Sequence, residues 1–220
     1  VHYPVSRVIC LENTHNTCNG APLNADYIAL VAHIAHENNL KLHIDGARIF
    51  NAAAALQTSA DQLVKEADSV TFCLSKGLCA PVGSLICGDS DYIARVHRAR
   101  KVLGGGMRQA GILAAAGLVA LEVMVDRLAD DHTRAKRLRD MFDAVPWIQA
   151  GPAYTNIFYF RLTEDAPFSG VQFAQALHDK DICLPNRGPY SFRVVTHYWI
   201  DDQAVNTVAD AVASIAATGK

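Results

Sequence analysis

Continuous apolar runs alternate with amphipathic stretches along the first half of the chain. The apolar runs predict strands at Val5–Leu11, Leu40–Ile44, Ser69–Leu74 and Gly83–Cys87. Between and after them, apolar residues at helical spacing predict a helix capped by Asn24, a second at Ser59–Glu66 and a third at Tyr92–Leu103. Because each strand is apolar throughout, the pattern favours an α/β fold, with a mostly parallel sheet that has helices on both faces.

The second half of the chain shows a different pattern. A helical region runs from the triple glycine Gly104–Gly106 to about Phe142, and the charged segment Asp126–Asp140 lies within it. Two strands (Ile157–Leu162 and Phe192–Tyr198) and two helices (Val171–Asp179 and Ala204–Ala217) are predicted beyond it. We therefore expect residues 1–125 to form part of a large domain and residues 126–220 to form a small α+β C-terminal domain.

Composition narrows the class of protein. Half of the 220 residues are hydrophobic and the net charge is −2, with no basic block that would bind nucleic acid or an anionic membrane. The longest alanine-rich apolar stretch, Gly111–Val125, contains Glu122 and is too short to span a bilayer. Val1–Arg7 lacks the layout of a signal peptide, so we expect a cytoplasmic protein. A first residue other than methionine suggests that the chain starts partway into a longer gene product.

Six cysteines are spread along the chain without a CxxC pair. They are Cys10, Cys18, Cys73, Cys79, Cys87 and Cys183. Several lie in apolar runs, where cysteine behaves as a small hydrophobic residue. We expect reduced, buried thiols and no metal site.

Polar residues follow three of the predicted strands. These strand ends are Glu12–Asn16, Asp45–Arg48 and Ser75–Lys76. In open α/β sheets, ligands collect beyond the carboxyl ends of the strands. A buried carboxylate (Asp45) and a buried amine (Lys76) at one sheet edge would suit pyridoxal 5'-phosphate (PLP), because a carboxylate can keep the pyridine nitrogen protonated and the amine can form an imine. From spacing alone, a capping aspartate and a solvated lysine explain these residues as well.

Several blocks of sequence resemble L-threonine aldolases of the low-specificity type. They are ENTHN at residues 12–16, HIDGARIFNA at 43–52, SVTFCLSKGLCAPVGS at 69–84, RKVLGGGMRQ at 100–109 and RVVTH at 193–197. The blocks occur in the family's order and extend over nearly the whole chain. The resemblance implies a PLP-dependent transferase-like fold (fold type I) and reversible cleavage of L-threonine or L-allo-threonine to glycine and acetaldehyde.

The resemblance also implies roles for individual residues. Lys76 would be the Schiff-base lysine, and Asp45 would pair with the pyridine nitrogen. Arg48 would contact the cofactor or the substrate carboxylate, and Arg193 would bind that carboxylate. Lys101 and Arg108 match family positions that reach the cofactor phosphate of a neighbouring subunit. This implies a homodimer or homotetramer with shared active sites.

Other readings of these and neighbouring residues stay open. Lys101 could belong to a solvated helix face. His15 could contact substrate or be a satisfied loop histidine, and His43 could support Asp45 or be a hydrogen-bonded core residue; His197 has no assigned role. Gly104–Gly106 lacks a phosphate-loop pattern and is interpreted as a flexible helix entry. The sequence does not identify the base that takes the β-hydroxyl proton.

The chain departs from the family in two ways. Cys18, Asn19 and Cys79 occupy positions where the family often has glycine. The family's N-terminal part, which carries its phosphate loop, is absent, so a separate chain would supply it or this chain would be a fragment. The rival functions are another β-hydroxy-amino-acid aldolase, a β-eliminating lyase, or a non-catalytic truncated or structural subunit.

Overall fold

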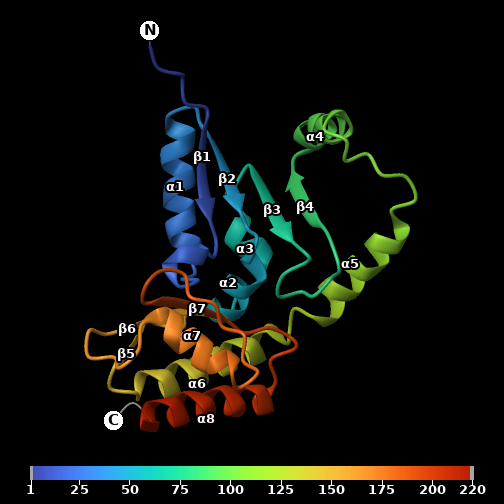
Figure 1. The fold of residues 1–220 in the computed structure, drawn as a ribbon. Coiled ribbons are helices and arrows are strands. Elements are labelled where there is room, and N and C mark those ends of the chain that lie inside the picture. Colours follow the sequence, from blue (N-terminus) through green and yellow to red (C-terminus); the bar gives the residue numbers. More distant parts are fainter. Residues whose placement is uncertain (1, 219–220) are drawn as a thin grey trace. The chain divides into compact units, whose positions relative to one another are not determined.

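The computed structural model describes residues 2–218, and its contacts divide the chain into two compact units (Figure 1). Unit 1 comprises Pro22–Arg127 and the chain before Asn16. Unit 2 comprises Asn16–Ala21 and the chain from Leu128 onward. The domain boundary expected at residue 125 stays a prediction.

Unit 1 is built on a four-stranded sheet with the order β1-β2-β3-β4. The strands are β1 (Val8–Glu12), β2 (Lys41–Asp45), β3 (Ser69–Cys73) and β4 (Ser84–Gly88). The helices are α1 (Ala25–Glu37), α2 (Ile49–Leu56), α3 (Ala60–Val64), α4 (Ser90–Val102) and α5 (Gly111–Val123). β1, β2 and β3 are parallel, which confirms the α/β class with a mostly parallel sheet.

β4 runs antiparallel to β3. A parallel strand would need a crossover of a dozen or more residues, and the link between these two strands is too short for one. The link is closed by Leu74, whose N–H donates to the carbonyl of Gly83 at 2.9 Å. The chain therefore turns back on itself immediately after β3.

The apolar face of this sheet packs against helices. Leu42, Ile44 and Val70 are buried with Ile28 and Ala32 of α1. A second cluster joins α2 and α3, with Phe50 and Phe72 in edge-to-face contact at 5.4 Å. Because side chains alternate along a strand, the residues between these apolar positions point to the opposite face. That face carries Glu12, His43, Asp45, Ser69 and Thr71.

Unit 2 contains a three-stranded antiparallel sheet with the order β5-β6-β7. Its elements are η1 (Asn16–Cys18), α6 (Leu128–Asp143), β5 (Ile148–Ala150), β6 (Ile157–Leu162), α7 (Gly170–His178), β7 (Ser191–Val195) and α8 (Asp202–Thr218). Aromatic side chains fill the core: Phe160 stacks on Phe192 at 4.8 Å, and both rings contact Phe173. This packing fixes the pairing of β6 with β7, because Phe160 and Phe192 are register partners.

Four features differ from the sequence prediction. The helix α2 and the short strand β5 were not predicted. The long helical region that follows the triple glycine is two helices, α5 and α6, separated by residues 124–127. The cysteines are free, but they are not buried: Cys73 is partly exposed and the other five are exposed. Within residues 2–218, no helix is long and apolar enough to cross a membrane.

At the edge of the sheet where β2 and β3 begin, the Asp68 carboxylate binds several neighbouring groups. Asp68, directly before β3, accepts hydrogen bonds from the Lys41 ammonium at 2.7 Å and from the N–H of Leu42 at 2.8 Å. His36, at the end of α1, lies 2.9 Å from the same carboxylate. Burial alone would raise the pKa of Asp68, but these partners outweigh it and lower the pKa to about 2.

We predict that Asp68→Asn destabilises unit 1 by about 1–2 kcal/mol at pH 7, a figure reduced for the partial exposure of the pair. The carboxyl pKa is lower in the folded state, so its contribution is complete above about pH 4 and is lost as the pH falls towards 2. Urea unfolding at several pH values measures this. The difference in unfolding free energy between variant and parent should shrink below pH 4. Glu66→Gln, which neutralises an exposed carboxylate of the same unit, should produce no such pH-dependent difference. A difference that does not change with pH would contradict the assignment.

Candidate active site

The polar strand ends meet at one edge of the unit 1 sheet. Glu12 and Asp45 are the last residues of β1 and β2, and they are register partners. Asp45 is also the register partner of Thr71 on β3. Lys76 follows the end of β3 by three positions. Because β2 and β3 are parallel neighbours, Asp45 and Lys76 belong to the same edge, as the sequence predicts.

The turn after β2 is shaped by Gly46. Its N–H donates to the carbonyl of Thr71 at 2.7 Å, and a Cβ at this position would also lie 2.7 Å from that oxygen. Only glycine therefore lets the chain approach β3 so closely. The Asp45 carboxylate accepts the N–H of Ala47 at 3.0 Å, and Arg48 precedes the first turn of α2. The turn thus holds a carboxylate and a guanidinium three residues apart.

The loop that carries Lys76 is held by buried apolar residues on both sides of it. Leu74, Leu78 and Ala80 are buried, and the N–H of Ala80 donates to the carbonyl of Leu74 at 3.0 Å. Cys79 has φ 59°, a left-handed conformation that glycine adopts without steric cost. Asn19 has φ 55°. These two departures from the family's glycines therefore fall where the backbone favours glycine.

The burial expected for the two principal residues is wrong. Asp45 and Lys76 are both exposed. The apolar side chains of α1, α2 and α3 pack against the other face of the sheet, so they do not cover the Asp45 side. The residues stand at the expected edge, but the described chain does not desolvate them.

The ENTHN loop after β1 is ordered by its own side chains. The Asn13 amide donates to the carbonyl of Leu23 at 2.9 Å and accepts the N–H of Leu23 at 3.0 Å. The Glu12 carboxylate lies 3.3 Å from Nε2 of His15. Thr14 Oγ1 is buried with no hydrogen-bond partner among the described residues. An unpaired buried hydroxyl costs about 1–3 kcal/mol of stability.

His43 supports the strand pair. Its Nδ1 lies 2.8 Å from the hydroxyl of Ser69 on β3, and the two residues are register partners two positions before Asp45 and Thr71. The contact cross-links β2 and β3 on the face that carries Asp45. This matches the alternative in which His43 is a hydrogen-bonded structural residue.

Arg193 belongs to unit 2, at the middle of β7. Its guanidinium donates to the side-chain oxygen of Asn16 at 2.9 Å. Sequence reasoning assigned no role to Asn16. The available signal was its place as the last residue of the ENTHN block, which belongs to the same set of family blocks as RVVTH.

Lys101 and Arg108 are exposed and lie on either side of the triple glycine. Lys101 lines a cationic cavity of about 390 Å³ together with His97, Arg98, Arg100 and three other residues. A Cβ on Gly106 would approach the Lys101 side chain to 2.5 Å, so this glycine makes room for the lysine stem. Gly104 has φ +85° and ends the helix.

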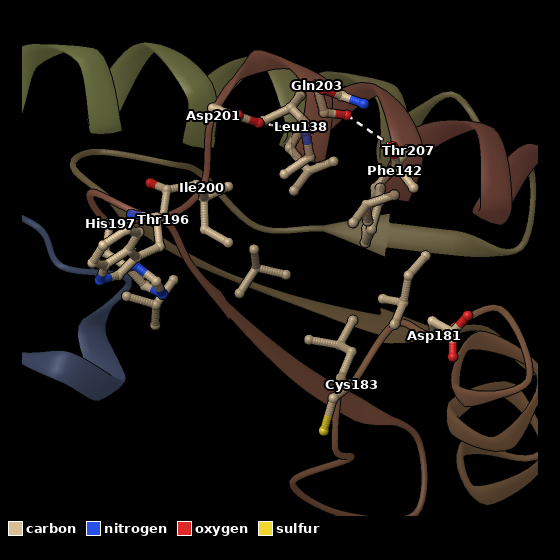
Figure 2. Close-up of a pocket in the computed structure, with 18 residues that line it drawn as sticks. Leu138, Phe142, Asp181, Cys183, Thr196, His197, Ile200, Asp201, Gln203 and Thr207 are labelled. Carbon is tan, nitrogen blue, oxygen red and sulfur yellow. Dashed lines mark hydrogen bonds between the residues drawn. The ribbon is translucent and has the colours of Figure 1, made fainter.

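A larger cavity of about 640 Å³ lies within unit 2 (Figure 2). Its wall is largely apolar, with Leu138, Phe142 and Ile200 among the lining side chains. His197 also lines it, and its Nδ1 accepts the N–H of Trp199 at 3.3 Å. The cavity contains none of the predicted site residues. Within residues 2–218, no group of three or more His, Cys, Asp or Glu side chains could hold a metal ion.

The sequence matches a known family and several known proteins over most of its length. Residues 1–165 match the family described as Beta-eliminating lyase. The "Probable low-specificity L-threonine aldolase 2" of Arabidopsis thaliana is 43% identical over 210 residues, which cover 94% of this chain and 59% of the relative. The low specificity L-threonine aldolase of Escherichia coli O157:H7 is 39% identical over 213 residues, 95% of this chain and 60% of the relative. The chain thus spans less than two thirds of these relatives.

Solved structures share the fold. The threonine aldolase of Leishmania major superposes with a TM-score of 0.77 at 15% identity, covering 98% of this chain and 63% of that one. A PLP-dependent aminotransferase from Streptococcus suis 89-1591 superposes with a TM-score of 0.71 at 15% identity, covering 97% of this chain and 58% of that one. Both bear out the fold type I architecture expected from the sequence.

We predict that Gly46→Ala destabilises unit 1 by about 1–3 kcal/mol, because the added methyl group must displace the Thr71 carbonyl. Denaturant unfolding measures the loss. Gly111→Ala is the matched control: a Cβ there meets nothing within 4 Å, and alanine in a helix is favoured over glycine. If both substitutions changed the free energy of unfolding equally, the close approach of Gly46 to the Thr71 carbonyl would not contribute to stability.

Proposed function

Since this chain belongs to the beta-eliminating lyase family, we propose that it acts in a PLP-dependent aldolase that cleaves L-threonine or L-allo-threonine to glycine and acetaldehyde. The observation that carries the proposal is the placement of Asp45 and Lys76 at the ends of neighbouring parallel strands. The 39–43% identity to low-specificity L-threonine aldolases supports the choice of substrate.

The residues at this edge suit PLP by their chemistry. The set offers an amine, a carboxylate and a guanidinium, and Gly46 keeps the turn between the last two close to the sheet. When bound, PLP supplies an electron sink for the pair released from the Cα–Cβ bond. Lys76 would hold the cofactor through its amine, and Asp45 would keep a proton on the pyridine nitrogen.

Two guanidinium groups would orient the substrate. Arg48 would contact the ring hydroxyl of the cofactor or the substrate carboxylate, and Arg193 would bind that carboxylate. A guanidinium can bind a carboxylate through two parallel hydrogen bonds, which fixes the rotation of the substrate about its Cα. That rotation determines which Cα bond is broken.

Lys101 and Arg108 would bind the cofactor phosphate of a neighbouring subunit in a homodimer or homotetramer. The cationic cavity at Lys101 supports a phosphate ligand, because a dianion gains charge-assisted hydrogen bonds from such side chains. A cytoplasmic location and a role in amino-acid metabolism that yields glycine complete the proposal. The nearest rival within the same family is a β-eliminating lyase, which product analysis with threonine, phenylserine and serine would reveal.

We predict that Lys76→Ala abolishes borohydride-trapped attachment of PLP and nearly all cleavage of threonine, because no other group would hold the cofactor covalently. Mass spectrometry after reduction locates the adduct, and visible absorbance of the purified protein reports it independently. Lys65→Ala, which removes an exposed lysine of the same unit, should change neither measurement. An adduct on a different lysine would refute the assignment.

Asp45→Asn should lower kcat on the order of a thousandfold while leaving the fold intact, because the amide cannot hold the ring nitrogen protonated. The asparagine oxygen can still accept the N–H of Ala47, so unfolding should change little. Steady-state kinetics with bound cofactor measures the loss, and Asp91→Asn, an exposed aspartate of α4, serves as the control. A kcat equal to that of the parent would exclude the role.

A further inference from the structure

Arg193 lies on the face of the unit 2 sheet that points away from the aromatic core. Its neighbours on β7, Phe192 and Val194, are buried, so alternation turns Arg193 to the other side. Tyr159 of β6 is its register partner. The Arg193 guanidinium donates a hydrogen bond of 2.9 Å to the side-chain oxygen of Asn16, a residue far from Arg193 in the sequence. Both Asn16 and Arg193 are half-buried, so solvent screens their contact only partly.

The segment that carries Asn16 is pinned to unit 2 at two further residues. Asn19 accepts the N–H of Tyr159 at 3.3 Å, and the Gly20 carbonyl accepts the Thr155 hydroxyl at 3.0 Å. Asn19 also lies against Gly151, where a Cβ would approach its side-chain oxygen to 3.2 Å. Asn16 is therefore held in place by contacts that do not involve Arg193.

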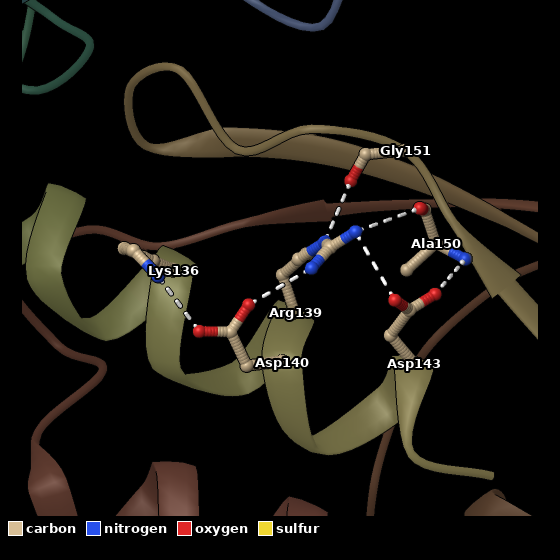
Figure 3. A network of polar contacts seen from close by, with 6 residues as sticks. All are labelled: Lys136, Arg139, Asp140, Asp143, Ala150 and Gly151. Atoms are coloured by element: carbon tan, nitrogen blue, oxygen red, sulfur yellow. Dashed lines mark hydrogen bonds and ion pairs between the residues drawn. The ribbon is translucent and has the colours of Figure 1, made fainter.

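A polar network on α6 secures the strand against which Asn19 lies (Figure 3). Arg139 donates to the carbonyl of Gly151 at 3.2 Å and forms an ion pair with Asp143 at 3.2 Å. Asp143 in turn accepts the N–H of Ala150 at 3.1 Å. The N–H of Gly151 donates to the carbonyl of Tyr159 at 2.7 Å. These hydrogen bonds and the ion pair link α6 to the end of β5, and the end of β5 to β6, next to the segment that carries Asn16.

We propose that Asn16 is a positioning residue for the proposed reaction: it fixes the plane of the Arg193 guanidinium and so sets the direction from which that group binds the substrate carboxylate. The inference rests on the proposed role of Arg193. A guanidinium presents its donors in one plane, so a bond at one nitrogen orients the others. Asn16 is uncharged, so it orients the guanidinium without neutralising the positive charge that a carboxylate needs.

The first test is the effect of Asn16→Ala on substrate binding in the purified protein loaded with PLP. We expect KM for L-threonine to rise about fivefold to tenfold with kcat within about twofold, the size of one lost hydrogen bond. Affinity for glycine should fall by a similar factor, while affinity for methylamine, which lacks the carboxylate, should not change. Equal losses for both ligands would overturn the proposal.

A second test separates positioning from general stability. In an Arg193→Lys background, Asn16→Ala should have no further effect on KM, whereas a structural role would add its own loss. Asn206→Ala removes a contact of the same kind, to Arg137 on α6, and should leave KM unchanged. Additive effects of the two substitutions on KM would also overturn the proposal.

The third measurement does not depend on turnover. In protein labelled with ¹⁵N-arginine, rotation of the Arg193 guanidinium should be slow in the parent and faster in Asn16→Ala, with the signal assigned through Arg193→Lys. Unchanged rotation would overturn the proposal. If the parent distinguishes glycine from methylamine without cleaving threonine, only the proposed reaction fails. If it does neither, both proposals fail.

Discussion

The parallel pairing of β1, β2 and β3 is the constraint on which the candidate site depends. Parallel strands end at the same edge, so Glu12, Asp45 and the loop that carries Lys76 come together although long stretches of chain separate them. Any slip of one residue in this register would turn Asp45 to the apolar face. The buried Ile44 and Val70, which alternate with the polar positions, prevent that slip by holding the sheet against α1.

The stabilising contacts of Asp68 and the candidate catalytic residues Asp45 and Lys76 lie at opposite ends of this sheet. Asp68 ties the beginnings of β2 and β3 to the end of α1 and satisfies its own charge with three partners. At the other end, the Asp45 carboxylate accepts the N–H of Ala47 at 3.0 Å, and both Asp45 and Lys76 are exposed. A rigid end thus holds the strands in register while the other end keeps its charged groups available to a ligand.

The ENTHN block, residues 12–16, contributes side chains to both compact units. Glu12 and His15 form their pair in unit 1, and the next residue, Asn16, belongs to unit 2 and contacts Arg193 there. The passage of the chain between units therefore falls inside a block that the sequence presents as a single motif. Four of its residues, Glu12 to His15, belong to unit 1, and the fifth, Asn16, belongs to unit 2.

The sequence alone determined the strands of the parallel sheet, the class of fold and the family, because these depend on local periodicity and on residue types at fixed spacing. It also predicted that Asp45 and Lys76 share a sheet edge, which follows from chain direction. Only the tertiary structure decided the exposure of the cysteines and of Asp45, and the contact between Asn16 and Arg193. These depend on which faces are covered and on contacts between distant residues, and no local pattern of hydrophobic and polar positions encodes them.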